Sequence, residues 1–127
     1  AKYADMWHGF GPPAQITRKI EILHRHCADV GRDPTEIEIT SGFDPGLCLR
    51  DSEREVQARR AEVGKRIGRP VAAAMPMWRV DDVVERLRDY ERVGVTSIIF
   101  GMGAPFDTET MQRFAAEVRP KFEAVAA

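Results

Sequence analysis

The sequence predicts an α/β fold with three parallel strands. Short β-branched segments alternate along the chain with longer segments whose apolar residues recur every three or four positions. This alternation is typical of parallel sheets with right-handed helical crossovers, and the expected order is strand, helix, strand, helix, helix, strand, helix. A chain of 127 residues, 43% of them hydrophobic, has the size and composition of one globular domain, so we expect a single domain over residues 1–127.

The first strand is expected at Ala4–His8, a short segment rich in large apolar side chains. After a glycine- and proline-rich loop, a helix is expected to begin at Pro13, because proline is tolerated in the first turn. Gly31 is expected to end this helix. Its apolar residues recur at helical spacing and predict one buried face: Ile16, Ile20, Leu23, Cys27 and Val30.

The second strand is expected at Glu36–Ser41, where polar and apolar residues alternate. Asp51 or Ser52 is expected to cap the next helix, which continues to about Ile67. This helix has few apolar residues, so we expect it at the surface with little contribution to the core. The segment Val71–Arg79 is expected to be irregular, since prolines bracket a short alanine run.

The third helix is expected to begin at Val80 and to end where Gly94 can take a left-handed conformation. Val95–Phe100 is expected to be a strand buried on both faces, because it is short and almost entirely apolar. Asp107 or Thr108 is expected to cap the last helix, which Pro120 should kink or restart. The expected apolar stripe of that helix is Met111, Phe114, Ala115, Val118, Phe122 and Val125.

The charge and the cysteine content limit the classes of function that the chain can have. Nineteen basic and twenty acidic residues give no excess of positive charge, so we expect no nucleic-acid partner. No apolar run is long enough to span a membrane, and we expect a cytoplasmic protein. Cys27 and Cys48 are expected to be free thiols, although the sequence leaves a disulfide open. The chain begins at Ala1 rather than at methionine, which suggests a fragment or a processed product.

Two glycine loops are the candidate binding sites. Each follows an expected strand and precedes a helix, so its backbone N–H groups can face an anion such as phosphate. A lone Gly-x-Gly is more often a flexible turn, but two such loops on the same rim of a sheet are stronger support than either alone. The candidate residues are His8, Gly9, Phe10 and Gly11 in the first loop, and Gly101, Met102, Gly103 and Thr108 around the second.

Other kinds of site have little support in the sequence. His24 and His26 lie two residues apart on a helix and point to different faces, so they cannot chelate one metal ion. We therefore expect no metal site, and no nucleophile motif identifies a catalytic residue. Glu38 has two interpretations: a carboxylate inside a closed barrel, which needs a partner, or a residue of an exposed edge strand.

Several of these segments together resemble the luciferase-like monooxygenase family. The matching segments are Ala4–Trp7 before a glycine loop, the helix end His26–Pro34, and the strand Ile37–Ile39. Asp82–Leu87 leading into Gly94–Thr96 also matches. The likeness is greatest to the deazaflavin-dependent members, which use coenzyme F420. It extends over nearly the whole chain but covers only the carboxyl-terminal part of that family's fold.

The resemblance implies half of a parallel (β/α)8 TIM barrel, since a whole barrel takes about 250 residues. Family members use FMN or coenzyme F420, and the loop that matches Trp7–Gly11 contacts the coenzyme phosphate, often through a lysine that this loop lacks. The family's catalytic residues belong to the absent amino-terminal half.

The implied function is to supply the phosphate-side loops of an oxidoreductase that acts on a small molecule, with this half alone inactive. The expected partner is the amino-terminal half or a second copy. The alternative is a non-catalytic half-barrel that serves as an assembly or ligand-binding module.

Overall fold

The computed structural model describes residues 1–71, 74–102 and 105–123. The chain forms two compact units. The first unit comprises residues 1–44 and 87–101, and the second comprises residues 45–86 together with those from 102 onward. Within the described residues, no helix combines the length and the apolar character that crossing a membrane requires.

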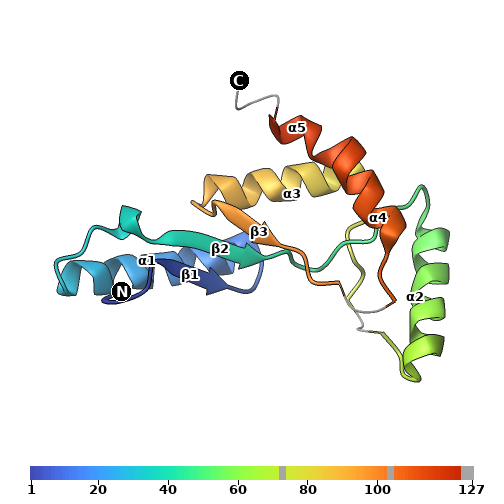
Figure 1. Cartoon of the computed structure of the whole chain (residues 1–127), viewed down its shortest axis with the longest axis horizontal. Coiled ribbons are helices and arrows are strands. Elements are labelled where there is room, and N and C mark those ends of the chain that lie inside the picture. Colours follow the sequence, from blue (N-terminus) through green and yellow to red (C-terminus); the bar gives the residue numbers. More distant parts are fainter. Residues whose placement is uncertain (72–73, 103–104, 124–127) are drawn as a thin grey trace. The chain divides into compact units, whose positions relative to one another are not determined.

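The first unit contains a three-stranded parallel sheet, which confirms the α/β class and the number of strands. Strands β1 (Met6–Gly9), β2 (Glu38–Gly42) and β3 (Ser97–Ile99) lie in the order β1-β2-β3 (Figure 1). Both pairs are parallel, and His8, Thr40 and Ser97 lie side by side across the sheet. The carboxyl ends of all three strands therefore meet at one edge of the sheet.

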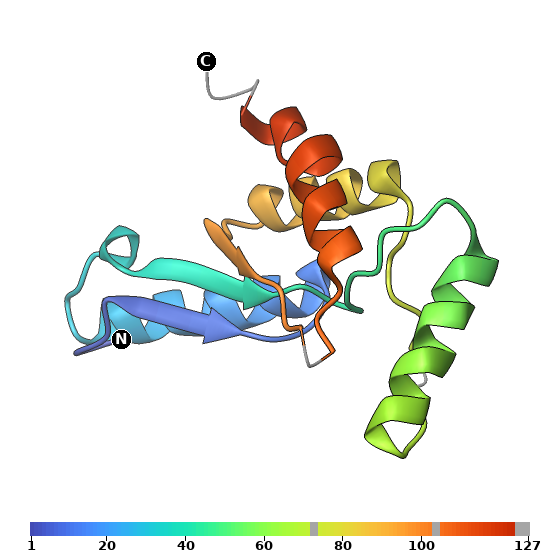
Figure 2. The ribbon, with the colours of Figure 1, turned by 45° about the vertical axis from the view of Figure 1, so that its right-hand side comes forward.

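Helix α1 (Pro13–Asp29) covers one face of this sheet (Figure 2). Its apolar stripe packs in one cluster with β2 and with the end of α3 (Val80–Arg92), and the short η1 turn (Pro34–Glu36) leads into β2. The predicted helix and its buried face are confirmed, except that Val30 lies just beyond the helix and is exposed. The buried residues of the cluster are Ile16, Ile20, Leu23, Cys27, Ile37, Ile39, Tyr90 and Val95.

All three expected strands differ in their bounds from the observed ones. The first begins at Met6 rather than Ala4, because the Arg32 guanidinium binds the carbonyl oxygens of Ala1 and Ala4 at 2.9 and 2.7 Å. The second is Glu38–Gly42 rather than Glu36–Ser41, because Glu36 ends the η1 turn. The third is only Ser97–Ile99, and its expected burial on both faces is wrong, since Ile99 is 54% exposed. The first unit's helices pack on one face of the sheet, and the Ile99 side of β3 is not covered by another element of that unit.

The second unit contains helix α2 (Glu53–Ile67). Ser52 caps it in a reciprocal hydrogen-bonded pair with Glu55, and Gly68 ends it in the left-handed conformation. Val56 is its one buried residue, which confirms the expected surface helix. The described residues of 71–79 form no helix or strand apart from a bridge between Leu47 and Met77, which confirms the irregular segment there.

The carboxyl-terminal helix is broken into α4 (Thr108–Arg113), a π-helical segment η2 (Phe114–Val118) and α5 (Pro120–Glu123). Asp107 caps α4, and the restart at Pro120 is confirmed. The expected apolar stripe is only partly correct. Val118 is buried as expected, but Met111 and Ala115 are exposed and Thr110 is buried instead, because its hydroxyl donates to Asp107 and accepts from the Leu49 N–H. Val125 lies outside the described residues.

Candidate functional site at the carboxyl edge of the sheet

The carboxyl edge of the sheet brings together residues from β1, α1 and α3. We call this group the carboxyl-edge site: His8, Phe10, Gly11, Lys19 and Tyr90. All five belong to the first unit. Ligands of parallel α/β sheets bind at this edge, so its local geometry decides which part of the first expected loop can contact a ligand.

Gly9 is a packing position rather than a flexible loop residue. It lies within β1, is buried and pairs with Ser41. A Cβ atom at Gly9 would come within 2.3 Å of Trp7 Cη2 and 2.9 Å of Ile16 Cδ1. The absence of a side chain therefore lets α1 approach the sheet closely. Gly11 differs, since its φ of +122° is a conformation that L side chains rarely adopt.

Phe10 is an exposed aromatic ring at the end of the sheet. Its side chain is 69% exposed, and its ring meets that of His8 edge-on with centroids 4.6 Å apart. A Cβ atom at Gly42 would lie 3.0 Å from Phe10 Cδ1, so the ring rests against the end of β2. This arrangement holds an apolar ring at the edge where a planar ligand can stack.

Lys19 supplies the positive charge that the loop sequence lacks. Its Nζ donates a hydrogen bond of 2.7 Å to the Phe10 carbonyl oxygen. Pro12 and Pro13 have no N–H group, so the start of α1 offers fewer backbone donors than most helices. The Lys19 ammonium is therefore the charged donor that the structure places at this loop. Sequence reasoning missed this residue because the lysine lies on the helix, nine positions after Phe10.

Tyr90 holds the loop after β1 in place through a hydrogen bond. Its side chain is fully buried, and its hydroxyl donates to the Gly11 carbonyl oxygen at 2.9 Å. The same hydroxyl accepts a hydrogen bond of 3.3 Å from the Asp44 backbone N–H. One side chain of α3 thus joins the loops that follow β1 and β2. Tyr90 follows Val83 and Leu87 at helical spacing, a pattern typical of a buried face, but nothing in the sequence indicated its two partners.

The residues expected around the second loop are divided between the two units. Gly101 belongs to the first unit, is exposed, and would have no neighbouring atom within 4 Å of a Cβ. Met102 and Thr108 belong to the second unit, and Gly103 lies outside the described residues. Across the sheet, β2 separates the end of β1 from the end of β3, so Gly11 and Gly101 do not follow neighbouring strands.

The start of α4 already holds a carboxylate. Asp107 accepts hydrogen bonds from the Thr110 N–H at 3.2 Å and from the buried Arg50 guanidinium at 2.9 Å. Burial acts to raise the pKa of Asp107, but these hydrogen bonds outweigh it and lower the pKa. The Asp107 carboxylate therefore takes the place of an external anion at this helix terminus.

Cys48 lies beside this buried ion pair. Its Sγ is 3.7 Å from Asp107 Oδ2. Burial, together with the Asp107 charge, raises the pKa of the Cys48 thiol, so the reactive thiolate is disfavoured. Cys27 and Cys48 are free thiols, as expected, and both are buried. The ion pair and the thiol thus form a structural cluster of the second unit.

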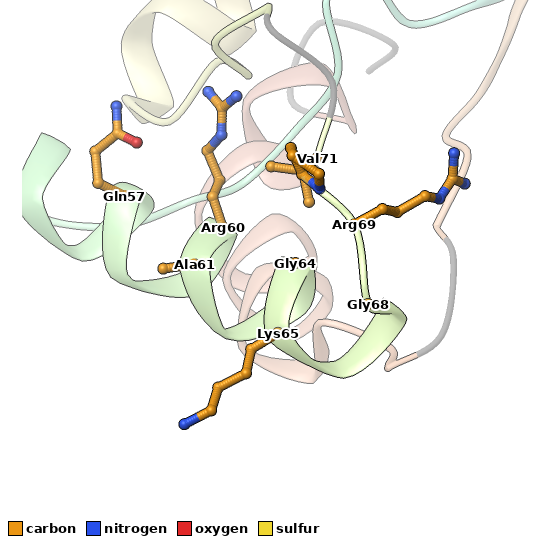
Figure 3. Close-up of a pocket in the computed structure, with 9 residues that line it drawn as sticks. Gln57, Arg60, Ala61, Gly64, Lys65, Gly68, Arg69 and Val71 are labelled. Carbon is orange, nitrogen blue, oxygen red and sulfur yellow. The ribbon is translucent and has the colours of Figure 1, made fainter.

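An open pocket of about 550 Å3 lies beside α2 in the second unit (Figure 3). Its charged lining residues are Arg60, Lys65 and Arg69. In Figure 3 the Lys65 and Arg69 side chains extend in different directions, away from each other. Arg60 contacts the Met75 sulfur at 3.0 Å. These cations do not converge on one point, so the pocket has no anion cradle.

No protein-family model matches the chain, and a search of curated proteins finds no match. Over the described residues, no group of three His, Cys, Asp or Glu side chains is placed to hold a metal ion. The proposed function therefore rests on the geometry of the carboxyl-edge site.

Proposed function

We propose that this chain is the carboxyl-terminal half of a luciferase-like (β/α)8 barrel that supplies the phosphate side of a site for coenzyme F420 or FMN. The intact enzyme would be an oxidoreductase acting on a small organic substrate. The observation that carries the proposal is the Lys19 ammonium held on the Phe10 carbonyl, at the carboxyl end of a parallel strand.

The order of strands and helices supports the half-barrel. Consecutive parallel strands that lie next to each other in the order β1-β2-β3 are the arrangement found within a (β/α)8 barrel. The helices of the first unit pack on one face of the sheet, as the outer helices of a barrel do. The opposite face would then become the barrel interior when the remaining strands are added.

The residues of the carboxyl-edge site fit the phosphate side of such a coenzyme. Lys19 can contact a phosphate oxygen, and Gly11 keeps the loop free of a side chain at that point. Phe10 offers an exposed ring beside it. The coenzyme, when bound, supplies the hydride chemistry. The residues of this half would bind and orient it, and Tyr90 would hold the loop in position.

The second glycine loop has a smaller part in the proposal. Gly101 follows β3 at the same edge of the sheet and leaves open space around it. The expectation that Met102, Gly103 and Thr108 also contribute to cofactor binding stays a prediction from the sequence.

Titration calorimetry with FMN, coenzyme F420 and inorganic phosphate tests the proposal. We expect at best high-micromolar affinity for either coenzyme, because the residues around the ring belong to the other half. Lys19→Gln should weaken binding at least about tenfold, since a hydrogen bond to a charged group contributes roughly 1.5–3 kcal/mol.

Arg18→Gln is the matched control, because Arg18 is the preceding exposed cation on α1. It should leave the affinity within about twofold, which corresponds to ~0.4 kcal/mol. Equal losses in the two variants would show that net charge, rather than the loop, binds the anion. A nanomolar complex with the isolated chain would contradict the assignment of only half a site. No binding at millimolar coenzyme would favour the non-catalytic module.

A further inference from the structure

Met75 is in contact with two side-chain N–H donors of α2. Its Sδ atom is 3.0 Å from Arg60 Nη1 and 3.5 Å from Gln57 Nε2. Gln57 and Arg60 are three positions apart on the helix, so they lie on the same face. Figure 3 shows both side chains extending to the same side of α2, away from Lys65. One thioether sulfur of the second unit thus meets donors from two turns of the helix.

The donors and the acceptor of this contact are unequal in strength. Guanidinium and amide N–H groups are strong donors, whereas a thioether sulfur is a weak acceptor. Oxidation of the sulfur to a sulfoxide adds a polar oxygen, which is a much better acceptor. At Met75 that oxygen would form beside two N–H groups, one of them on a cation. The surroundings of Met75 therefore suit the oxidised side chain better than the reduced one.

The Met75 sulfur can be reached by a small oxidant. Met75 is half-buried, and Gln57 and Arg60 line the open pocket of about 550 Å3 beside α2. The thiols of the chain are poor competitors for the same oxidant. Cys27 and Cys48 are both buried, and burial raises the pKa of the Cys48 thiol, which disfavours the reactive thiolate.

We propose that Met75 is a methionine oxidation site, at which hydrogen peroxide forms a sulfoxide that Arg60 and Gln57 bind. A sulfur lone pair attacks one peroxide oxygen, and the S–O bond forms as the O–O bond breaks. The sulfur loses two electrons, and the peroxide is reduced by two. The leaving oxygen takes up the proton of the transferred oxygen and departs as water. The N–H groups of Arg60 and Gln57 stabilise the negative charge that develops on the oxygens and then donate to the sulfoxide.

The sulfoxide would attach an irregular segment more firmly to a helix that contributes little to the core. Val56 is the buried residue of α2, and the segment that carries Met75 is held to the second unit by hydrogen bonds such as that from the Met77 N–H to the Gly46 carbonyl oxygen. Stronger bonds from α2 to residue 75 would make local opening of this segment rarer. Enzymatic reduction restores the thioether, so the change would be reversible. The inference concerns the second unit and does not rest on the proposed function.

Peroxide treatment of the folded chain, followed by tandem mass spectrometry of its peptides, tests the reactivity. Met77 is the matched reference, because it lies two residues away and is likewise half-buried. We expect Met75 to oxidise at least about fivefold faster than Met77, since donors placed at developing charge accelerate a reaction. Met6 and Met111 are 54% and 53% exposed and report the rate of exposed methionines, which Met75 should match.

Two variants separate the donors from the accessibility of the sulfur. Gln57→Leu and Arg60→Leu each remove one donor, and each should slow Met75 oxidation about threefold while leaving Met77 unchanged. Arg66→Leu is the control, because Arg66 is an exposed cation of the same helix, and it should change neither rate. In denaturing guanidinium Met75 and Met77 should oxidise equally, which identifies a variant that has failed to fold. Gln57 is exposed, so Gln57→Leu should keep the fold if Arg60→Leu does not.

Hydrogen exchange at the Met77 amide tests the effect of the sulfoxide. Its N–H donates to the Gly46 carbonyl oxygen at 2.9 Å. Oxidation should slow this exchange about threefold in the wild type but not in Gln57→Leu. Equal oxidation rates of Met75 and Met77 in the folded wild type, or faster exchange after oxidation, would overturn the proposal. An equal slowing of Met75 oxidation in Arg66→Leu would also overturn it, because the charge of α2 rather than the two contacts would then set the reactivity.

Discussion

Replacing Tyr90 by phenylalanine removes a hydroxyl that is hydrogen-bonded to the loops after β1 and β2. The ring can stay in the core, where Tyr90 is fully buried and packs with Phe43 at a centroid distance of 6.2 Å. The variant therefore separates the two hydrogen bonds from the apolar contribution of the ring. The Gly11 carbonyl oxygen and the Asp44 N–H each lose the hydrogen bond to the Tyr90 hydroxyl.

The expected loss of stability follows from those two bonds. Each hydrogen bond contributes about 0.5–1.5 kcal/mol net, so the first unit should lose about 1–3 kcal/mol. Both partners are only half-buried, so water can replace part of the loss, and we expect about 2 kcal/mol. For a domain of this size that lowers the melting temperature by roughly 10 °C.

Urea unfolding, monitored by tryptophan fluorescence, measures this loss of stability. Each unit contains one tryptophan, so a Trp78→Phe background leaves Trp7 as the reporter of the first unit. Hydrogen exchange at the Asp44 amide should accelerate at least tenfold, which corresponds to ~1.4 kcal/mol. Tyr3→Phe is the control, because Tyr3 is 84% exposed and should change stability by less than about 0.5 kcal/mol. Equal stability of the two variants would refute the assigned role of the hydroxyl.

Three further predictions concern the packing, the buried charge and the sheet edges. Gly9→Ala should cost the first unit about 1–3 kcal/mol in urea unfolding through overpacking, whereas Gly101→Ala should be neutral; equal effects would contradict the packing role. The hydrogen bonds that lower the pKa of Asp107 stabilise the second unit above the unfolded value of 3.8, and this contribution is lost as the pH falls through the folded pKa. Trp78 fluorescence should therefore show acid destabilisation below about pH 4, and Asp107→Asn should lessen it; an unchanged pH profile would exclude this carboxylate as the cause. Because β1 and β3 are both edge strands in the described residues, the isolated chain should self-associate in sedimentation experiments, and a compact monomer at low micromolar concentration would argue against a barrel half.

Local patterns in the sequence determined the class of the fold and most of its helices. The spacing of Ile16, Ile20, Leu23 and Cys27 predicts α1 and its buried face, and both are observed. Ser52 and Asp107 were among the helix boundary residues that the sequence indicated. These features depend on residues within a few positions of one another, which is the range over which propensity, capping and periodicity act.

The composition of the candidate site depended on the tertiary structure. The sequence identified the loop His8–Gly11, but it assigned a loop role to Gly9, which the packing of Trp7 and Ile16 explains instead. It also assigned both faces of β3 to the core, whereas Ile99 is exposed. Neither the Lys19 contact nor the partners of Tyr90 could be read from a local pattern. Tyr90 and Gly11 are 79 positions apart in the chain. Contacts at that separation form only when the strands and helices pack, so sequence periodicity can predict that a residue is buried but not which group it meets.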